Sequence, residues 1–175
     1  YGLAMDHVGR YRARGVNVGL GTDCAPHNLI EEMRLAIVAG RLMSEDIRSL
    51  DTAGAFEAAT FGGAAALGRD DIGALAPGMA ADIVLVDLEH PLMQPARDPL
   101  RSFVFHAADR AVQTVIVDGE IVLKDGDPVH LDPKAAMERL AEAQARMLRD
   151  SVKLDYANRP GDEISPLSLS ISQSS

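Results

Sequence analysis

Asp23 is the residue of this sequence whose type and position could do chemistry. It follows the short apolar segment Val16–Leu20 and a Gly-Thr pair, a pattern typical of the end of a buried parallel strand. Catalytic side chains collect at the carboxyl ends of such strands. A carboxylate there can ligate a divalent metal and accept a proton from an attacking water. The same carboxylate could instead cap a turn or the next helix, and so short a string leaves both interpretations open.

Three residues close to Asp23 are further candidates for a role in the site. His27 lies four residues later and could line a substrate pocket, or it could be an exposed loop residue without a chemical task. Asn28, with Glu31 three positions later, predicts a capping-box start for a helix, and it is also a candidate for substrate binding. Cys24 is better explained as a small packing residue than as a nucleophile, because no base is paired with it by sequence.

The other titratable residues show no spacing that suggests a site. Neither His-x-His nor His-x-x-x-His occurs, and no Gly-rich phosphate loop or Ser-centred elbow is found. The adjacent acids Glu31-Glu32 and Asp70-Asp71 are predicted to be solvated surface charge. A structural or surface role is expected for the remaining histidines, His7, His90, His106 and His130.

Composition limits the classes of partner. The 175 residues carry a formal charge of −9 with scattered Lys and Arg, which argues against nucleic-acid and anionic-membrane binding. An apolar content of 47% permits a sizeable core. No apolar stretch approaches the roughly 20 residues that cross a bilayer. The single cysteine excludes an internal disulfide and fits the reducing cytoplasm. A small-molecule substrate or a protein partner stays open.

The elements expected around Asp23 follow the α/β order of helix, strand, loop and helix. Apolar residues at helical spacing predict a helix after Asn28, with Ile30, Met33, Ile37 and Val38 on one face. The other expected elements are a helix at Met5–Arg14, the strand Val16–Leu20, and a helix at Thr52–Leu67 with Thr52 as its N-cap.

From Asp71 onward the pattern changes to β-structure. Asp118-Gly119 between two apolar runs is a strong hairpin signal, and Asp125-Gly126 offers a further turn. Asp132-Pro133 has the form of an N-cap followed by a first-turn proline, and it predicts a last helix with an apolar stripe of Met137, Leu140, Met147 and Leu148. The expected strands are Asp82–Asp87, Val112–Val117 and Glu120–Lys124, with a Pro-interrupted connection at Pro91–Pro99.

Four stretches, in order over roughly residues 8–126, resemble the C-terminal part of amidohydrolase-superfamily enzymes, particularly the deaminase and chlorohydrolase branch. They resemble the last barrel strand with its loop and helix, the helix after the barrel, the return into a small β domain and the closing hairpin. In this sequence they are VNVGLGTDCAPHNLIEEMRLA, TAGAFEAATFGGAAALG, IGALAPGMAADIVLVDL and VQTVIVDGEIVLKDG.

The resemblance implies an α/β fold: the last strand–helix units of a (β/α)8 barrel, followed by part of a small β-sandwich and a C-terminal helix. The expected divisions are residues 1–70 for the barrel part, 71–130 for the β-sandwich part, 131–157 for the helix and 158–175 for a flexible tail. The family hydrolyses C–N, or sometimes C–Cl, bonds of cyclic amidines and related rings with a divalent metal, zinc or else iron. Asp23 matches its strand-eight aspartate, a metal ligand and proton shuttle.

The family's histidine ligands have no counterpart here, and Tyr1 opens the chain without a Met, so the chain is expected to be a fragment and inactive alone. A barrel needs roughly 250 residues. Exposing Val16–Leu20 and its helix would forfeit roughly 1.5–3 kcal/mol per side chain, against a domain stability of roughly 5–15 kcal/mol. We therefore expect pairing with a missing N-terminal barrel segment or self-association, with a homo-oligomeric full-length form. The alternative is a catalytically inactive structural or interaction module.

Overall fold

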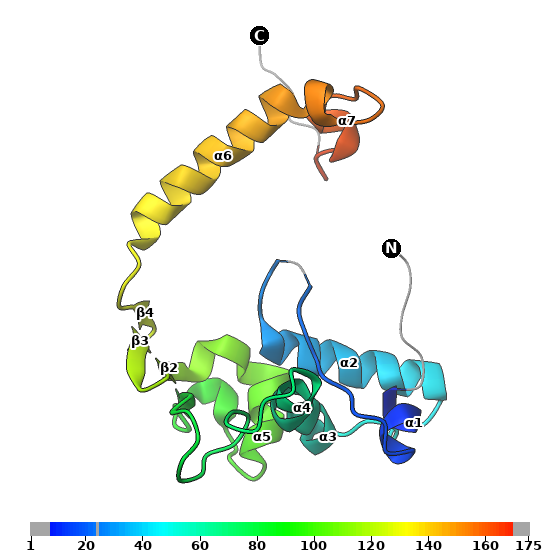
Figure 1. Cartoon of the computed structure of the whole chain (residues 1–175), viewed down its shortest axis with the longest axis vertical. Helices are drawn as coiled ribbons and strands as arrows, with labels where there is room; N and C mark the ends of the chain where they lie inside the picture. Colours follow the sequence, from blue (N-terminus) through cyan, green and yellow to red (C-terminus); the bar gives the residue numbers. More distant parts are fainter. Residues whose placement is uncertain (1–7, 24, 170–175) are drawn as a thin grey trace. The chain divides into compact units, whose positions relative to one another are not determined.

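The computed structural model describes residues 8–23 and 25–169. The chain divides into two compact units, residues 1–129 and 130–175 (Figure 1). The expected helix at Met5–Arg14 is found as α1, Val8–Ala13, and its residues 5–7 lie outside the described ones. None of the helices in the described part of the chain is long and apolar enough to cross a membrane.

Helix α2, Leu29–Ser44, supplies much of the core of the first unit. It begins after Asn28, as predicted. Met33 and Ile37 on its predicted apolar face are buried, whereas Val38 is 43% exposed. Ile37 is fully buried. The buried residues of the same cluster come from α1, α2 itself, the loop before Asp51, the next helix and the segment after residue 100: Val8, Met33, Leu50, Ala55 and Val104.

The helix predicted at Thr52–Leu67 is confirmed as one continuous helical run with a change of pitch. It consists of α3 at Thr52–Glu57, the π-helical turn η1 at Ala58–Gly62, and α4 at Gly63–Ala66. The N-cap is Asp51 rather than Thr52, because the Asp51 carboxylate accepts a hydrogen bond from the Gly54 N–H at 2.7 Å. A carboxylate satisfies an unpaired helical N–H group at least as well as a hydroxyl.

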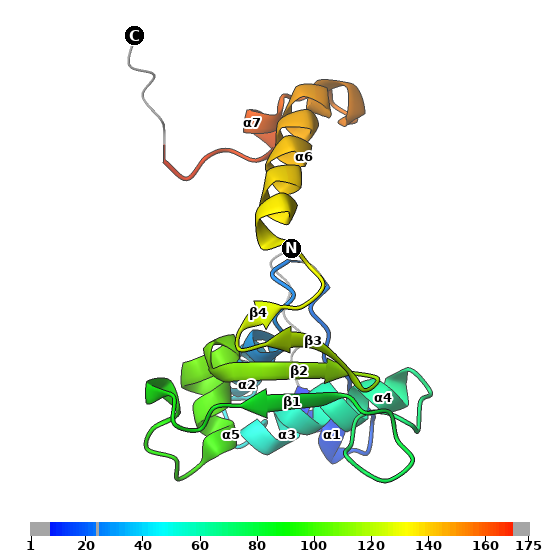
Figure 2. The same ribbon diagram turned by 90° about the vertical axis from the view of Figure 1, so that its left-hand side faces the viewer.

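The predicted β-structure is confirmed as a four-stranded antiparallel sheet in the order β1-β2-β3-β4, which Figure 2 shows from one edge strand to the other. Asp118 and Gly119 form the hairpin turn with φ of 49° and 82°, the left-handed values that a tight hairpin requires. The Asp82 carboxylate accepts a hydrogen bond from the Asp118 N–H at 2.8 Å and ties β1 to this turn. The strands are Ile83–Val86, Val112–Val117, Glu120–Lys124 and Asp127–Pro128.

The connection between β1 and β2 is mostly helical rather than only Pro-interrupted coil. It holds the 3₁₀ turn η2 (Pro91–Met93), α5 (Pro99–Ser102), the π-helical turn η3 (Phe103–Ala107) and the 3₁₀ turn η4 (Ala108–Ala111). A second buried cluster of Met93, Ala107 and Ala111 packs beneath Val86 of β1 and Phe103. This cluster joins the sheet to the helical connection.

The prediction of a parallel strand at Val16–Leu20 is wrong for this chain. Within the described residues, Val16–Leu20 is not a strand and does not belong to the four-stranded sheet. Its polar groups turn to the helix instead: the Leu20 N–H donates to the Ala58 carbonyl at 3.1 Å and Asn17 Nδ2 donates to the Gly62 carbonyl at 3.0 Å. A Cβ at Gly62 would overlap the Val18 carbonyl, so the approach requires a glycine.

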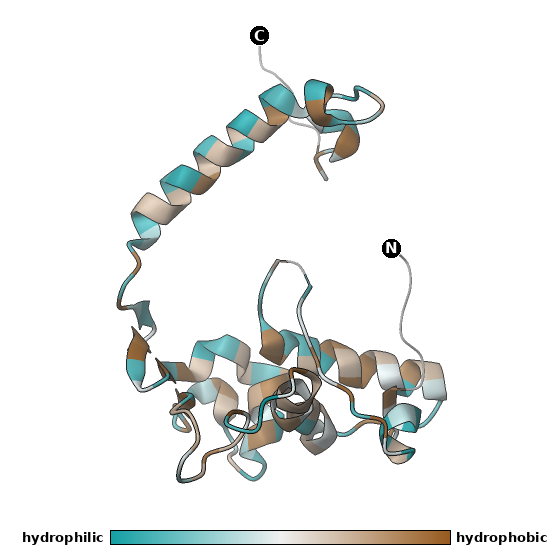
Figure 3. Ribbon diagram, viewed as in Figure 1, coloured by the Kyte–Doolittle hydropathy of each residue, from teal (hydrophilic) through white to brown (hydrophobic). Residues whose placement is uncertain are grey.

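The second unit consists of the long helix α6, Pro133–Leu154, and the short helix α7, Gly161–Ile164. The Asp132 N-cap and first-turn Pro133 are confirmed, with the carboxylate accepting from the Lys134 and Ala135 N–H groups. Hydrophilic and hydrophobic residues alternate along α6 (Figure 3). The predicted apolar stripe Met137, Leu140, Met147 and Leu148 is exposed. Helix α7 lies within residues 158–175, the segment that was expected to be a flexible tail.

The turn after α6 is closed by an ion pair between Asp155 and Arg159. Arg159 donates from Nη2 at 2.8 Å and from Nε at 3.1 Å, and the Ala157 and Arg159 N–H groups donate to the same carboxylate. The Arg159 guanidinium also lies 5.2 Å from the centroid of the Tyr156 ring. The hydrogen bonds from the Arg159 side chain hold the pKa of the Asp155 carboxyl well below its usual range.

Truncating Ile37 should destabilise the first unit far more than truncating its neighbour. Ile37→Ala is expected to lower the free energy of unfolding by about 2–5 kcal/mol, because it leaves a cavity in the helical core. Val38→Ala on the same helix should cost less than about 1 kcal/mol. Urea unfolding of the purified protein measures both, and equal losses would contradict the assigned core.

Protonation of Asp155 should release the turn after α6. Because the folded-state pKa is depressed, the pair stabilises the turn above the ordinary carboxyl pKa of about 3.9, and this stabilisation is lost as pH falls through the folded value. A carboxyl-carbon NMR titration should show Asp155 titrating below the ordinary carboxyl pKa. In Arg159→Gln the Asp155 titration should move up towards its ordinary range, and an unchanged curve would reject the pair.

Candidate functional site

Asp23 lies on an exposed loop directly after the Val16–Leu20 segment. Its φ of 56° is left-handed, a conformation that Asp tolerates better than most residues and that is worth inspection in any non-glycine residue. The side chain is exposed, and no hydrogen bond or ion pair reaches its carboxylate from the residues that the structure describes. The carboxylate is therefore available to a ligand from outside the chain.

His27 is held against the start of the same loop. Its Nδ1 and the Thr22 Oγ1 are hydrogen bonded at 3.1 Å, which closes the loop around Asp23. The ring is exposed. Since Nδ1 is engaged, Nε2 is the ring nitrogen left to face a bound molecule. Cys24, predicted as a packing residue, lies outside the described residues.

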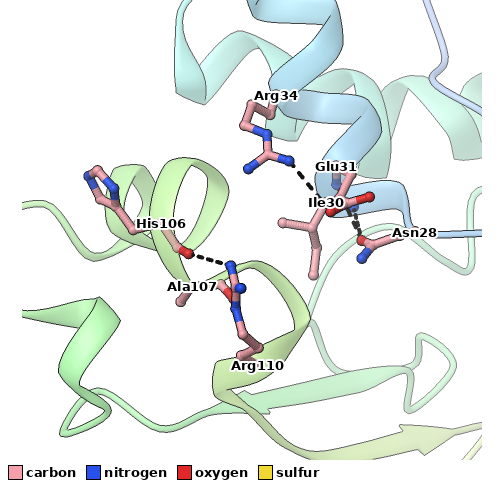
Figure 4. Close-up of polar contacts among 7 residues, drawn as sticks. All are labelled: Asn28, Ile30, Glu31, Arg34, His106, Ala107 and Arg110. Carbon is pink, nitrogen blue, oxygen red and sulfur yellow. Dashed lines mark hydrogen bonds and ion pairs between the residues drawn. The ribbon is translucent and has the colours of Figure 1, made fainter.

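Asn28 is the N-cap of α2, as its sequence position predicts. Its Oδ1 accepts hydrogen bonds from the N–H groups of Ile30 at 3.1 Å and Glu31 at 3.2 Å (Figure 4). The reciprocal half of the capping box is absent from the described contacts, because the Glu31 carboxylate pairs with Arg34 at 3.4 Å. The Asn28 carbonyl oxygen thus has a structural task, and its amide nitrogen is the atom left for substrate.

The end of the helical connection faces the first turns of α2. It contains a contact, made by Arg110, that the sequence did not predict. Arg110 donates to the carbonyl oxygens of His106 at 2.9 Å and Ala107 at 3.1 Å (Figure 4). It thereby satisfies carbonyl groups at the end of η3, as a basic residue does at a helix C-terminus. A basic side chain three residues after an apolar helical run is the signal that could have identified it.

The described residues do not form a metal site by themselves. Within residues 8–23 and 25–169 no group of three or more His, Cys, Asp or Glu side chains could hold a metal ion. Asp23 can offer one ligand, and His27 in the same loop is engaged with Thr22. A zinc or iron centre requires three or four ligands, so these residues fit one corner of such a centre and no more.

Among the hollows that the described residues form on the first unit are two that Asp23 does not line. One, of about 380 Å³, runs along the unpaired segment and is lined by Tyr11, Val16, Asn17, Val18 and Gly19. The other, of about 450 Å³, is formed by the loop before α5, by α5 itself and by His106 of η3. Sequence reasoning assigned His106 only a structural or surface role and did not single out the arginines beside it.

Comparison with known proteins gives one family. The model described as "Amidohydrolase family" matches residues 5–122. A 5-methylthioadenosine/S-adenosylhomocysteine deaminase of Pelotomaculum thermopropionicum is 41% identical over 139 residues, covering 77% of this chain and 31% of that protein. A 5'-deoxyadenosine deaminase of Methanothermobacter thermautotrophicus is 43% identical over 145 residues, covering 81% and 34%.

Solved structures show the same likeness. An adenosine deaminase from Xanthomonas campestris with bound zinc superposes with a TM-score of 0.75 at 30% identity, covering 79% of this chain and 33% of that one. An atrazine chlorohydrolase from Arthrobacter aurescens complexed with zinc superposes with a TM-score of 0.67 at 27% identity, covering 80% and 31%. The chain spans about a third of the length of the curated relatives it matches.

Replacing Asn28 should separate its capping task from any contact with substrate. Asn28→Ala removes the acceptor of two N–H groups at the start of α2 and should cost about 0.5–2 kcal/mol of stability. Asn28→Asp keeps the acceptor and should leave stability close to wild type. Thermal unfolding measures the difference, and an Ala variant as stable as the Asp variant would contradict the cap.

Proposed function

We propose a function from one premise: this chain belongs to the amidohydrolase family. We infer that it is the C-terminal part of a hydrolase that cleaves a non-peptide C–N bond, removing an amino group from a heteroaromatic ring. The adenosine-type deaminases among its relatives favour the amino-substituted purine of a nucleoside as substrate. A chlorohydrolase among the solved neighbours keeps C–Cl hydrolysis as the alternative reaction.

The observation that carries the proposal is the environment of Asp23. Its carboxylate is exposed at the end of the Val16–Leu20 segment and accepts no hydrogen bond from the described residues. A carboxylate with only a structural task would be expected to cap a turn or helix, as Asp51, Asp98 and Asp132 do in this chain. Asp23 has no such task and is free to act on a ligand.

In the proposed reaction Asp23 is both metal ligand and proton carrier. A divalent cation in such a site supplies a water that ionises near neutral pH. Asp23 accepts the proton of the attacking water and then delivers it to the departing amine, which leaves as ammonia. Zinc is preferred over iron because solved relatives contain zinc.

The residues beside Asp23 are proposed to contact substrate. The hydrogen bond between Thr22 Oγ1 and His27 Nδ1 restrains the imidazole and leaves its Nε2 as the ring nitrogen available to substrate. The Asn28 amide nitrogen has no described partner while its oxygen caps α2, so it can donate to an acceptor on the substrate. These roles rest on the Asp23 assignment.

We propose that the remaining metal ligands come from outside the described residues, because these hold no group of three or more ligating side chains. The unpaired Val16–Leu20 segment and the hollow of about 380 Å³ beside it offer a place for neighbouring barrel strands. A missing N-terminal segment that docks there would supply both backbone partners and histidines. The chain by itself is then inactive, and a cytoplasmic, homo-oligomeric full-length enzyme is part of the same proposal.

The second candidate is an inactive structural or interaction module. The exposed apolar stripe of α6 and the lack of a metal-binding group among the described residues favour it. The coding sequence upstream of Tyr1 discriminates the two. An in-frame segment with His-x-His supports the enzyme, and a start codon there supports the module.

Asp23→Asn should abolish turnover. The chain is co-expressed with its upstream segment, and release of ammonia from 5'-deoxyadenosine and of chloride from a chlorotriazine is measured along with metal content. The asparagine variant should lose at least about 10³-fold in kcat, because it can no longer accept a proton. Asp70→Asn, another exposed aspartate without a described partner, is the control and should retain activity. Unchanged turnover in Asp23→Asn would reject the proposed role.

A further inference from the structure

The hollow of about 450 Å³ on the first unit is rich in hydrogen-bond donors, and no residue of the Asp23 loop lines it. It is formed by the loop before α5, by α5 and by His106 near the end of η3. The lining residues that carry the inference are Gln94, Arg97, Asp98, Arg101, Ser102 and His106.

Two guanidinium groups border this pocket without a carboxylate partner. Neither Arg97 nor Arg101 makes a side-chain hydrogen bond or ion pair with the residues that the structure describes. Other arginines of the chain are paired, as Arg69 is with Asp71 and Arg159 is with Asp155. On a chain of net charge −9, two unpaired cations beside one hollow make a local positive site.

Ser102 adds a neutral hydrogen-bond donor to the lining of the pocket. The residue is only 9% exposed, and its hydroxyl makes no hydrogen bond with the described residues. The hydroxyl oxygen is not among the fully buried unpartnered polar atoms of the described residues, so a ligand in the pocket can reach it. A bound acceptor can therefore receive a hydrogen bond from this hydroxyl.

One carboxylate, that of Asp98, lines the pocket, and one of its oxygens already accepts a hydrogen bond. Asp98 Oδ1 accepts the backbone N–H of Arg101 at 3.1 Å and so caps the first turn of α5. The remaining carboxylate charge opposes an anion and partly offsets the two arginines. This makes Asp98 a residue whose removal should strengthen anion binding.

The walls are held in place before any ligand arrives. Gln94 Nε2 donates to the Leu88 carbonyl at 2.7 Å, and the Arg97 N–H donates to the Pro95 carbonyl at 2.9 Å. Met93, 1% exposed, anchors the loop in the second buried cluster. These contacts fix the backbone of the walls, whereas the exposed Arg97 and Arg101 side chains are left to be ordered by a ligand.

We propose that this pocket is a binding site for a small oxyanion, a phosphate or carboxylate group. The Arg97 and Arg101 guanidinium groups bind its oxygens, and the Ser102 hydroxyl donates a further hydrogen bond to it. Guanidinium groups suit this task because their N–H donors match the geometry of phosphate and carboxylate oxygens. The site is independent of the proposed hydrolytic reaction.

Calorimetric titration of the full-length protein tests the site, with inorganic phosphate and malonate as separate probes in low-salt buffer. One saturable site is expected for the preferred anion, and the stronger probe identifies the class. Arg97→Ala/Arg101→Ala should weaken binding at least about tenfold, because charge-assisted hydrogen bonds are lost. Arg48→Ala, whose side chain is 90% exposed, is the control and should not change binding.

Two isosteric variants separate the site from general damage to the fold. Asp98→Asn keeps the helix cap but removes the opposing charge, so binding should become several-fold tighter. Ser102→Ala should weaken it by about threefold or more. The proposal is overturned if neither probe binds. It is also overturned if the double arginine variant binds as well as wild type, which is the result expected if the anion is held at a metal centre instead.

Discussion

The segment Val16–Leu20 must satisfy its backbone polar groups, and the position of the Asp23 loop depends on how it does so. In a barrel, strands on both sides would pair with it. In this chain the Leu20 N–H instead reaches the Ala58 carbonyl, and the Asn17 side chain reaches the Gly62 carbonyl. The π-helical turn Ala58–Gly62 and the missing side chain at Gly62 permit this approach.

The buried helical core also supports the Val16–Leu20 segment. Val18 and Leu20 pack against the cluster around Ile37, so the same segment both leads into the Asp23 loop and covers the core. Buried apolar contacts of this kind are non-directional, and they tolerate the change from a paired strand to a helix-supported segment. The antiparallel sheet has its own hydrogen-bond network and joins the helices through the cluster around Met93.

The chain has about a third of its relatives' length, and it holds only part of the groups that a metal centre would need. It contains one carboxylate poised on a loop, a histidine fixed by Thr22 and a capping asparagine. These groups all belong to the loop that follows Val16–Leu20 and to the N-cap of α2. A metal centre draws ligands from several strand ends, because no single loop can surround a cation. The oxyanion pocket differs in this respect, since all its lining residues lie between residues 94 and 106.

Local chemistry in the sequence determined the elements whose ends depend on neighbouring residues. The Asn28 and Asp132 caps, the Asp118-Gly119 hairpin and the helices α2 and α6 follow from contacts within a few residues, and each is found. Tertiary structure decided what depends on distant partners: the state of Val16–Leu20, the burial of Ile37 beside an exposed Val38, and the unpaired arginines around one hollow. Backbone pairing and burial require groups far apart along the chain, and no local spacing specifies whether those groups meet.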